Sequence, residues 1–335
     1  MEQILAPYLL CLGNETELTF TKTAKGILDW RPEKCHGQIG LEGCTVDLGL
    51  KTISIENARA EGIKTLVLGV APPGGVIPES WHSLLFLALE NGLDIASGLH
   101  SKLVDVPNLS ETAARLERKL FDVRHSTQSF SVGSGDPRQG KRLLTVGTDC
   151  AVGKMYSALA IEKEMQQRGC NVDFAATGQT GIFISGKGVS VDAVVSDFIS
   201  GAAEFLSPVN NDQHWDIIEG QGSLFHPSFA AVTLGLVHGS QPDAMILCHE
   251  VGRKEIIGTN HYPIPNLDDC MKTYLDAARL TNKKAIFVGA CFNTSSLSND
   301  EAELYLVTKE KNLGIPCTDP YRYGVAKIVD RLEGF

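Results

Sequence analysis

The sequence lacks the features that mark several large classes of protein. Its nine cysteines are scattered and include no C-x-x-C pair, so we expect reduced thiols in a cytoplasmic protein and no structural zinc site. No stretch approaches the roughly 18 uninterrupted apolar residues that a membrane-spanning helix needs. The first residues also lack the basic and apolar parts of a signal peptide.

Positive charge is scarce as well. The chain has 30 basic and 40 acidic residues, a net charge of −10, and no basic run. This balance disfavours nonspecific binding to nucleic acid or to an anionic membrane, because both carry negative charge. The first domain lacks the G-x-G-x-x-G pattern of dinucleotide-binding proteins, so a nicotinamide-dependent enzyme is a remote alternative. Small molecules remain as the expected partners.

What the chain does contain is an α/β pattern in two blocks. With 335 residues, 43% of them hydrophobic and 21% charged, it is long enough for two globular domains. We expect a first domain at residues 1–130, a linker at 131–141 and a second domain at 142–335, because glycine, proline and polar residues gather between the blocks. Strand-like and helix-like stretches alternate in the first domain, at 64–71, 78–91, 94–100 and 109–120. This alternation predicts a small doubly wound sheet.

The second domain shows the same alternation over a longer stretch. Its apolar, strand-like runs lie at 142–148, 171–177, 215–219, 243–249, 284–290 and 315–318. The helix-like stretches lie at 154–168, 198–205, 228–237, 268–282, 299–312 and 322–332. The pattern predicts a parallel sheet with helices on both faces.

The most specific signal is a phosphate-binding loop between the first strand and the first helix of this domain. The segment Gly147–Met155 ends an apolar run with Gly153 and Lys154 and leads into a helix-like stretch. Backbone N–H groups of such a loop and the lysine together bind phosphate. Two positions depart from the usual pattern, because Thr148 stands where the first glycine belongs and Met155 replaces the serine or threonine that binds Mg²⁺. A thioether is a poor Mg²⁺ ligand, so we expect a pyrophosphate site without ordinary Mg-nucleotide chemistry.

Polar or glycine-rich segments also follow the neighbouring strands. They are Ala176–Ile182, which includes Gln179 and Thr180; Glu219–Ser223, which includes Gln221; and Cys248–Glu250, followed by Arg253 and Lys254. Because ligands bind at the carboxyl ends of parallel strands, these segments predict one crevice beside the phosphate loop. Each also has a purely structural interpretation: a tight turn at 177–181, an ion pair at Glu219, a core histidine at His249, or a solvated helix start at 253–254. His226, near the Glu219 segment, is a further candidate.

Two resemblances extend this interpretation. Gly147–Met155 and Glu219–Ser223 resemble the phosphate loop and the acidic strand exit of dethiobiotin synthetase, an ATP-dependent ligase. Five segments together resemble the DUF1611 family, whose described members are DgcN-type N-acetyltransferases: Val70–Gly75, Ser97–His100, Gly147–Met155, Ala176–Gly181 and Glu219–Pro227. That family joins an N-terminal Rossmann-like domain to a C-terminal P-loop domain. Its D-glutamate branch makes N-acetyl-D-glutamate from acetyl-CoA, and a partner epimerase converts the product to the L form.

The family resemblance implies an amino-acid N-acetyltransferase, with D-glutamate as the expected substrate. The phosphate loop would hold acetyl-CoA by its pyrophosphate, without a metal, through Thr148, Asp149, Cys150, Ala151, Val152, Gly153, Lys154 and Met155. Glu219 is the first candidate for the general base and His249 the second. The substrate would contact Gln179, Thr180, Gln221, Arg253 and Lys254. The resemblance also implies self-association into a homo-oligomer and coupling to an N-acyl amino-acid epimerase. The alternatives are an ATP-dependent ligase or kinase of the dethiobiotin synthetase type, or a nucleotide-sensing protein without activity.

Overall fold

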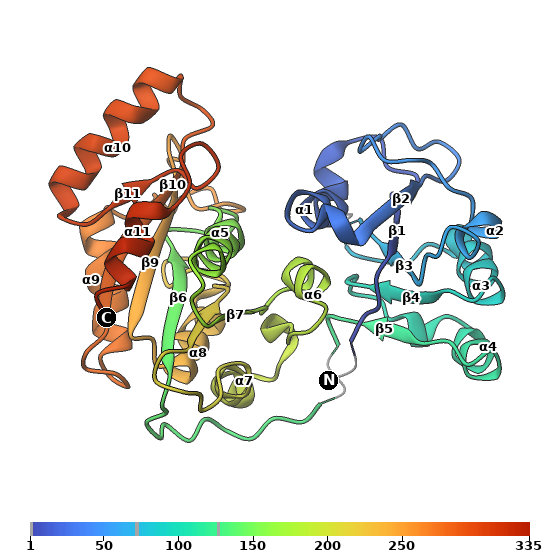
Figure 1. Ribbon diagram of the computed structural model, residues 1–335, viewed down its shortest axis with the longest axis horizontal. Coiled ribbons are helices and arrows are strands. Elements are labelled where there is room, and N and C mark those ends of the chain that lie inside the picture. Colours follow the sequence, from blue (N-terminus) through green and yellow to red (C-terminus); the bar gives the residue numbers. More distant parts are fainter. Residues whose placement is uncertain (1–2, 71–73, 126–127) are drawn as a thin grey trace. The chain divides into compact units, whose positions relative to one another are not determined.

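The computed structural model describes residues 3–70, 74–125 and 128–335 (Figure 1). The chain forms two compact units. Unit 1 contains residues 1–128 and 178–193, and unit 2 contains residues 129–177 and 194–335. Residues 71–73 of the Val70–Gly75 segment lie outside the described part of the chain.

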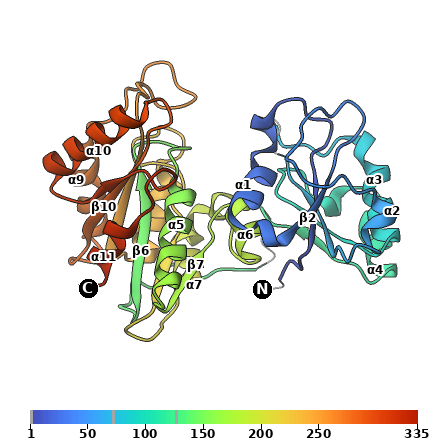
Figure 2. The same ribbon diagram turned by 45° about the horizontal axis from the view of Figure 1, so that its top comes forward.

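Unit 1 is built on a five-stranded parallel sheet in the order β2-β1-β3-β4-β5. The strands are β1 (Tyr8–Cys11), β2 (Cys35–Ile39), β3 (Thr65–Leu68), β4 (Asp94–Ser97) and β5 (Leu120–Asp122). The helices are α1 (Lys22–Trp30), α2 (Ile55–Ala58), α3 (His82–Glu90), α4 (Leu109–Arg115) and α6 (Gln179–Ser185). In Figures 1 and 2, α1 and α6 lie on one side of the sheet and α2, α3 and α4 on the other. The doubly wound sheet expected from the alternating pattern is therefore present.

Helix α6 comes after the linker in the sequence but belongs to unit 1. Sequence analysis places residues 178–193 in the second domain, whereas in the structure they pack with the first unit. Several hydrogen bonds tie them there: the Tyr8 hydroxyl donates to the carbonyl of Phe183 (3.4 Å), Lys34 Nζ to that of Ile184 (2.7 Å), and the Ile4 amide to that of Gly186 (3.3 Å). Arg124 also forms an ion pair with Asp192. The apolar side chains of α6 are buried, because α6 covers the sheet beside α1.

Unit 2 contains a six-stranded parallel sheet in the order β11-β10-β9-β6-β8-β7. Its strands are β6 (Lys141–Gly147), β7 (Val172–Ala175), β8 (Trp215–Ile218), β9 (Ala244–Glu250), β10 (Ile286–Asn293) and β11 (Cys317–Thr318). Its helices are α5 (Lys154–Gln167), α7 (Ile199–Leu206), α8 (Ala230–Ser240), α9 (Leu267–Ala278), α10 (Asn299–Leu313) and α11 (Ala326–Leu332). Each of the six expected strands and six expected helices is found, with shifts of a few residues at the ends.

The helices of unit 2 lie on both faces of this sheet. α5 and α11 pack together on one face, and α7, α8 and α9 lie on the other (Figures 1 and 2). This division follows from right-handed crossovers, because the chain reverses direction along the sheet after β7. β6 lies between β8 and β9, so the segments that follow these three strands meet at one edge.

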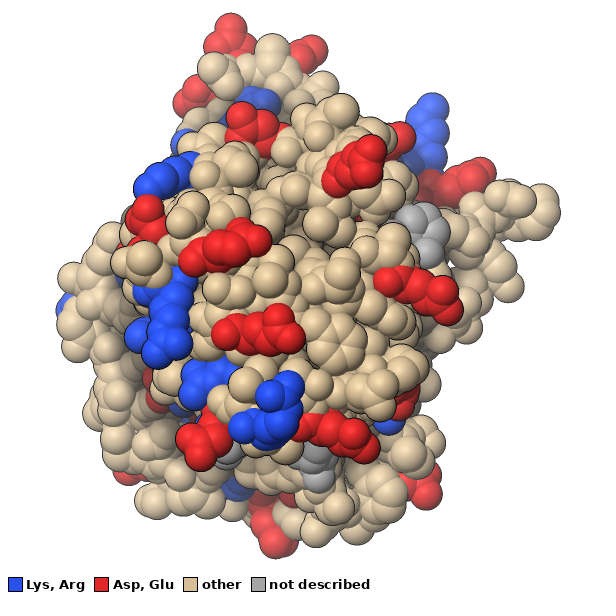
Figure 3. Space-filling model, turned by 90° about the vertical axis from the view of Figure 1, so that its right-hand side faces the viewer, with Lys and Arg blue, Asp and Glu red and all other residues tan. Residues whose placement is uncertain are grey.

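No helix of the described residues combines the length and the apolar character that a bilayer crossing requires. On the face drawn in Figure 3, acidic side chains are spread over the surface, and basic side chains gather mainly toward the left and lower left, next to acidic ones.

Candidate functional site

The phosphate loop runs from Thr148 to Gly153 and joins β6 to α5. Ala151 and Gly153 have left-handed backbone conformations, with φ of 53° and 95°. The amides of Ala151, Val152 and Gly153 have no hydrogen-bond acceptor among the described residues. Three amides without acceptors at the start of a helix fit an anionic group such as a diphosphate.

Lys154 lies at the first position of α5 and is almost fully buried. Its Nζ donates a hydrogen bond to the carbonyl of Asp149 (2.8 Å). Burial lowers the pKa of this ammonium group, and the nearby acidic groups offset only part of the effect. The first turn of α5 thus places a cation beside the free amides of the loop.

Asp149 and Arg253 connect the loop to the segment that follows β9. The Asp149 side chain is fully buried and accepts hydrogen bonds from the amide of Cys150 (2.6 Å), from Arg253 (2.8 Å) and from the amide of Ile257 (2.8 Å). Arg253 also donates to the carbonyls of Cys150 (2.7 Å) and Ala151 (3.3 Å) and forms an ion pair with Glu250. The expected contact between Arg253 and the substrate stays a prediction, and its observed partners belong to the loop and to Glu250.

Glu219 follows β8 and is buried beside the segment that follows β7. The amide of Thr177 donates to Glu219 Oε2 (2.9 Å), and the Thr177 hydroxyl donates to the Glu219 carbonyl (2.7 Å). Gln221 Nε2 in turn donates to the Thr177 hydroxyl (3.2 Å). Glu219 also lies close enough to Lys154 to favour the charged form of the lysine. The structure therefore brings Glu219, Gln221 and Lys154 into one region, as the strand order predicts.

Gly220 lies in the segment that follows β8 (the β8 exit) and contacts Thr145 of β6. A Cβ atom on this residue would lie 1.7 Å from the carbonyl oxygen of Thr145 and 3.0 Å from Cδ of Lys154. The Gly220 amide also donates to the Thr145 hydroxyl (3.0 Å).

We expect Gly220→Ala to lower the free energy of unfolding by about 1–3 kcal/mol, because a backbone oxygen cannot move aside as a side chain can. Denaturant unfolding of the purified variant measures the change. The matched control is Gly334→Ala, where the nearest atom lies 3.7 Å from the new methyl group. Equal stabilities of the two variants would contradict this close approach.

His249 lies at the carboxyl end of β9 and is mostly buried. Its Nδ1 is 3.0 Å from the hydroxyl of Thr148. Burial, with smaller contributions from Lys309 and Arg253, lowers the pKa of His249 from 6.5 to about 4. The imidazole is therefore neutral at neutral pH and lies against the phosphate loop.

This pKa shift predicts a pH-dependent stability. Between the two pKa values the unfolded chain binds a proton at His249 and the folded chain does not, so folding weakens as the pH falls through this window. When the pH falls from about 7 to about 4.5, the free energy of unfolding should decrease by about 2–3 kcal/mol more in the wild type than in His249→Gln, whose side chain does not titrate. Denaturant unfolding at both pH values checks this, and the same pH dependence in both proteins would refute it.

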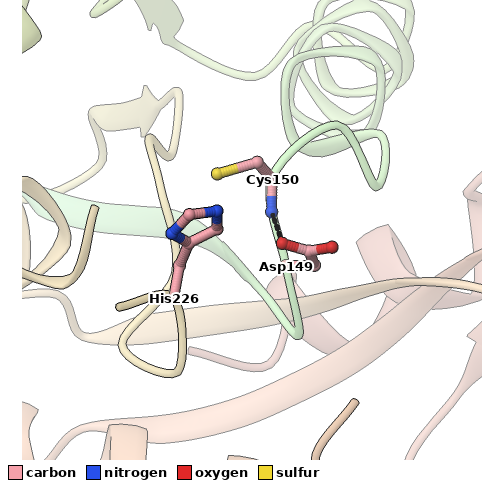
Figure 4. A group of neighbouring side chains, drawn as sticks. All are labelled: Asp149, Cys150 and His226. Atoms are coloured by element: carbon pink, nitrogen blue, oxygen red, sulfur yellow. Dashed lines mark hydrogen bonds between the residues drawn. The ribbon is translucent and has the colours of Figure 1, made fainter. Parts of the chain in front are cut away.

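Asp149 and Cys150 of the loop form a cluster with His226 (Figure 4). One potential metal-ligand atom from each residue falls within 4.8 Å of the other two. Both nitrogens of His226 have partners, since Nε2 is 3.1 Å from the carbonyl of Ile257 and Nδ1 accepts from the amide of Ser228 (3.1 Å). Burial raises the pKa of the Cys150 thiol, and both carboxylate oxygens of Asp149 are hydrogen-bonded. These groups fit a metal ion poorly, because ligation would break several of these bonds.

Tyr274 is a site residue that sequence analysis did not identify. It is fully buried on α9, donates its hydroxyl hydrogen to the carbonyl of Gly147 (2.9 Å) and accepts from the amide of Leu224 (3.1 Å). Burial raises the pKa of this phenol above its usual value. The spacing of the apolar residues in α9 predicts a buried position for Tyr274 but not the bridge between the loop and the β8 exit.

Of the remaining expected binding residues, Gln179 and Thr180 belong to unit 1, and Lys254 and Met155 belong to unit 2. Gln179 and Thr180 begin α6 in unit 1, where Gln179 packs against Gly98 so closely that a Cβ on Gly98 would lie 2.2 Å from its Oε1. The structure thus brings the segment 97–100 and Gln179 together. Lys254 is exposed, and Met155 is half-buried on α5. Their roles in binding stay predictions.

Comparison with known proteins gives matches along nearly the whole chain. Residues 39–126 match the Rossmann-like domain, and residues 131–329 the P-loop domain, of DUF1611, both described as domains of unknown function. A D-glutamate N-acetyltransferase of Tritonibacter scottomollicae is 50% identical over 329 residues, 98% of this chain and 99% of the relative. One from a Pseudoalteromonas species is 48% identical over 330 residues, with the same coverage. The crystal structure of a DUF1611 family protein from Anabaena variabilis has a TM-score of 0.86 and 32% identity and covers 99% of this chain and 100% of its own.

Proposed function

Because this chain belongs to the DUF1611 family, we propose that it is a D-glutamate N-acetyltransferase that uses acetyl-CoA as the donor. The observation that carries the proposal is the identity of about half of all residues, over the full length, to two relatives of that name. The site chemistry described above is compatible with it.

The phosphate loop supplies a binding site for the donor. Coenzyme A contains a pyrophosphate, and the free amides of Ala151–Gly153 with the Lys154 ammonium form a suitable anion site. Acetyl transfer breaks a thioester and leaves the pyrophosphate intact, so the reaction needs no Mg²⁺ at the loop. The replacement of the usual hydroxyl by the Met155 side chain therefore does not impair acetyl transfer.

The reaction also needs a base and donors for an oxyanion. The substrate's ammonium group loses a proton, its nitrogen attacks the thioester carbonyl carbon, and the C–S bond breaks to release coenzyme A as a thiol. We assign the base to Glu219, which is buried near Lys154. Within Gly220–Ser223, the backbone amides other than that of Gly220, which donates to Thr145, would stabilise the tetrahedral oxyanion. N-acetyl-D-glutamate would then pass to an N-acyl amino-acid epimerase.

The decisive experiment incubates the purified protein with acetyl-CoA and a panel of D- and L-amino acids. We expect D-glutamate to gain one acetyl group by mass spectrometry, with release of one equivalent of free thiol. Acetylation of a different amine would leave the reaction class in place and change the substrate. Mg-dependent ATP turnover with a carboxylic acid, and no acetylation, would instead favour the ligase alternative.

The variant Met155→Thr separates the two reaction types further. It restores the hydroxyl that Mg-nucleotide loops use. Because acetyl transfer needs no metal at the loop, we expect the variant to acetylate at close to the wild-type rate. For the same reason, EDTA should not reduce the activity of the wild type. Initial rates with and without chelator check both points. A strict Mg²⁺ requirement in the wild type, or activation of ATP turnover by the new threonine, would contradict the proposed reaction.

A further inference from the structure

The observed partners of Asp149 and Arg253 indicate a role that differs from the direct donor and substrate contacts expected for them. We propose that these two side chains form a brace that holds the phosphate loop in its anion-binding shape, so that Arg253 is a positioning residue for the donor and not a cation for the substrate's carboxylates. The part of this inference that concerns acetyl-CoA rests on the proposed function.

The guanidinium of Arg253 has almost no capacity left for another ligand. One terminal nitrogen donates to Asp149 Oδ2 and to the carbonyl of Cys150, and the other to the carbonyl of Ala151 and to Glu250. These bonds use the four N–H donors of the two terminal nitrogens, which leaves the single N–H of Nε. The side chain is only 15% exposed. A substrate carboxylate would find little of the bidentate surface that arginine normally offers.

The charges around Arg253 also weaken its attraction for a further anion. Asp149 lies on one side of the guanidinium and Glu250 on the other, so two carboxylates surround one cation. The positive charge of Arg253 is therefore already offset by carboxylates of this chain. A substrate carboxylate would gain little attraction from it.

The contacts of Arg253 explain how a loop without its first glycine keeps its shape. Ala151 has a φ of 53°, a conformation that costs a residue with a side chain about 1 kcal/mol or more. Arg253 holds the carbonyls of Cys150 and Ala151, which lie on either side of the Ala151 Cα, while Asp149 holds the amide of Cys150. With these carbonyls fixed on Arg253, the next three amides stay free for a diphosphate.

The brace continues into the segment after Arg253. The Ile257 amide donates to Asp149, and the Ile257 carbonyl lies 3.1 Å from Nε2 of His226. This pairing gives the cluster in Figure 4 a structural role, since its histidine and its carboxylate both hold the backbone of Ile257. The loop, the β8 exit and the β9 exit are thus joined at one residue.

The test compares Arg253→Gln with Arg168→Gln. Arg168 is a matched control, because it also binds several carboxylates (Glu164, Asp330 and Glu333) but lies after the other end of α5. For Arg253→Gln we expect coenzyme A to bind about 10- to 100-fold more weakly by calorimetry, as loss of hydrogen bonds to a charged group implies. The KM for acetyl-CoA should rise with it, and the KM for D-glutamate should not change. Arg168→Gln should leave all three values unchanged.

A measurement without ligand keeps this inference separate from the proposed function. Hydrogen–deuterium exchange of residues 149–155 should be faster in Arg253→Gln than in the wild type and unchanged in Arg168→Gln. This result is expected even if the wild type fails to acetylate D-glutamate, an outcome that would count against the proposed function alone. If Arg253→Gln does not fold, Arg253→Lys replaces it, since one ammonium group cannot reach all four acceptors. A raised KM for D-glutamate, with unchanged coenzyme A binding and unchanged exchange in the loop, would overturn the brace.

Discussion

Glu219→Gln should lower kcat for acetyl transfer by about 100- to 10,000-fold, the range that a general base contributes. Glutamine has nearly the same size and can still accept the hydrogen bond that the Thr177 amide donates to Oε2. The substitution therefore removes the proton acceptor and retains the local packing. Initial rates at saturating acetyl-CoA and D-glutamate measure the effect.

The comparison with His249→Gln decides between the two candidate bases. Burial lowers the pKa of His249 to about 4, so the imidazole is a weak base, and its Nδ1 faces the hydroxyl of Thr148. We expect a smaller loss of kcat in His249→Gln than in Glu219→Gln, with coenzyme A binding retained in Glu219→Gln. The reverse order of the two effects would move the role of base to His249.

The surroundings of Glu219 show which parts of the candidate site can be predicted from the sequence. Parallel strands end at one edge of a sheet, so an apolar run followed by Gly153 and Lys154 predicts the β6–α5 turn and places the β8 and β9 exits beside it. The hydrogen bonds Thr177–Glu219 and Thr148–His249 join segments that this rule brings together.

Contacts between irregular segments could not be predicted in the same way. No periodicity relates Asp149 to Arg253, because both lie in loops whose conformations depend on the whole fold. Helix α6 was missed because glycine and polar residues at 178–181 favour a turn, whereas burial of Ile182, Phe183 and Ile184 stabilises a helix. β2 was missed because Cys35–Ile39 has no apolar run, although it pairs with β1.

Lys154→Ala should raise the KM for acetyl-CoA by about 100- to 1,000-fold, as removal of one partner from a buried ionic contact does. Lys154 is the cation at the start of α5, beside the three free amides of the loop. If the loop holds a pyrophosphate that does not react, the lysine contributes equally to ground-state and transition-state binding, and kcat at saturating donor should stay near the wild-type value. Steady-state kinetics with varied acetyl-CoA measure both parameters.

The pH dependence of donor binding supplies the control for this assignment. Burial lowers the pKa of Lys154, so its charge is present at low pH and is lost as the pH rises through a value below 10.5. Coenzyme A affinity of the wild type should fall over that range, whereas Lys154→Arg, which stays charged, should not show the fall. In an ATP-dependent enzyme the lysine would stabilise the reacting phosphate, so its loss would lower kcat as well as affinity. A large fall in kcat with an unchanged KM for acetyl-CoA would therefore contradict a loop that only holds the donor.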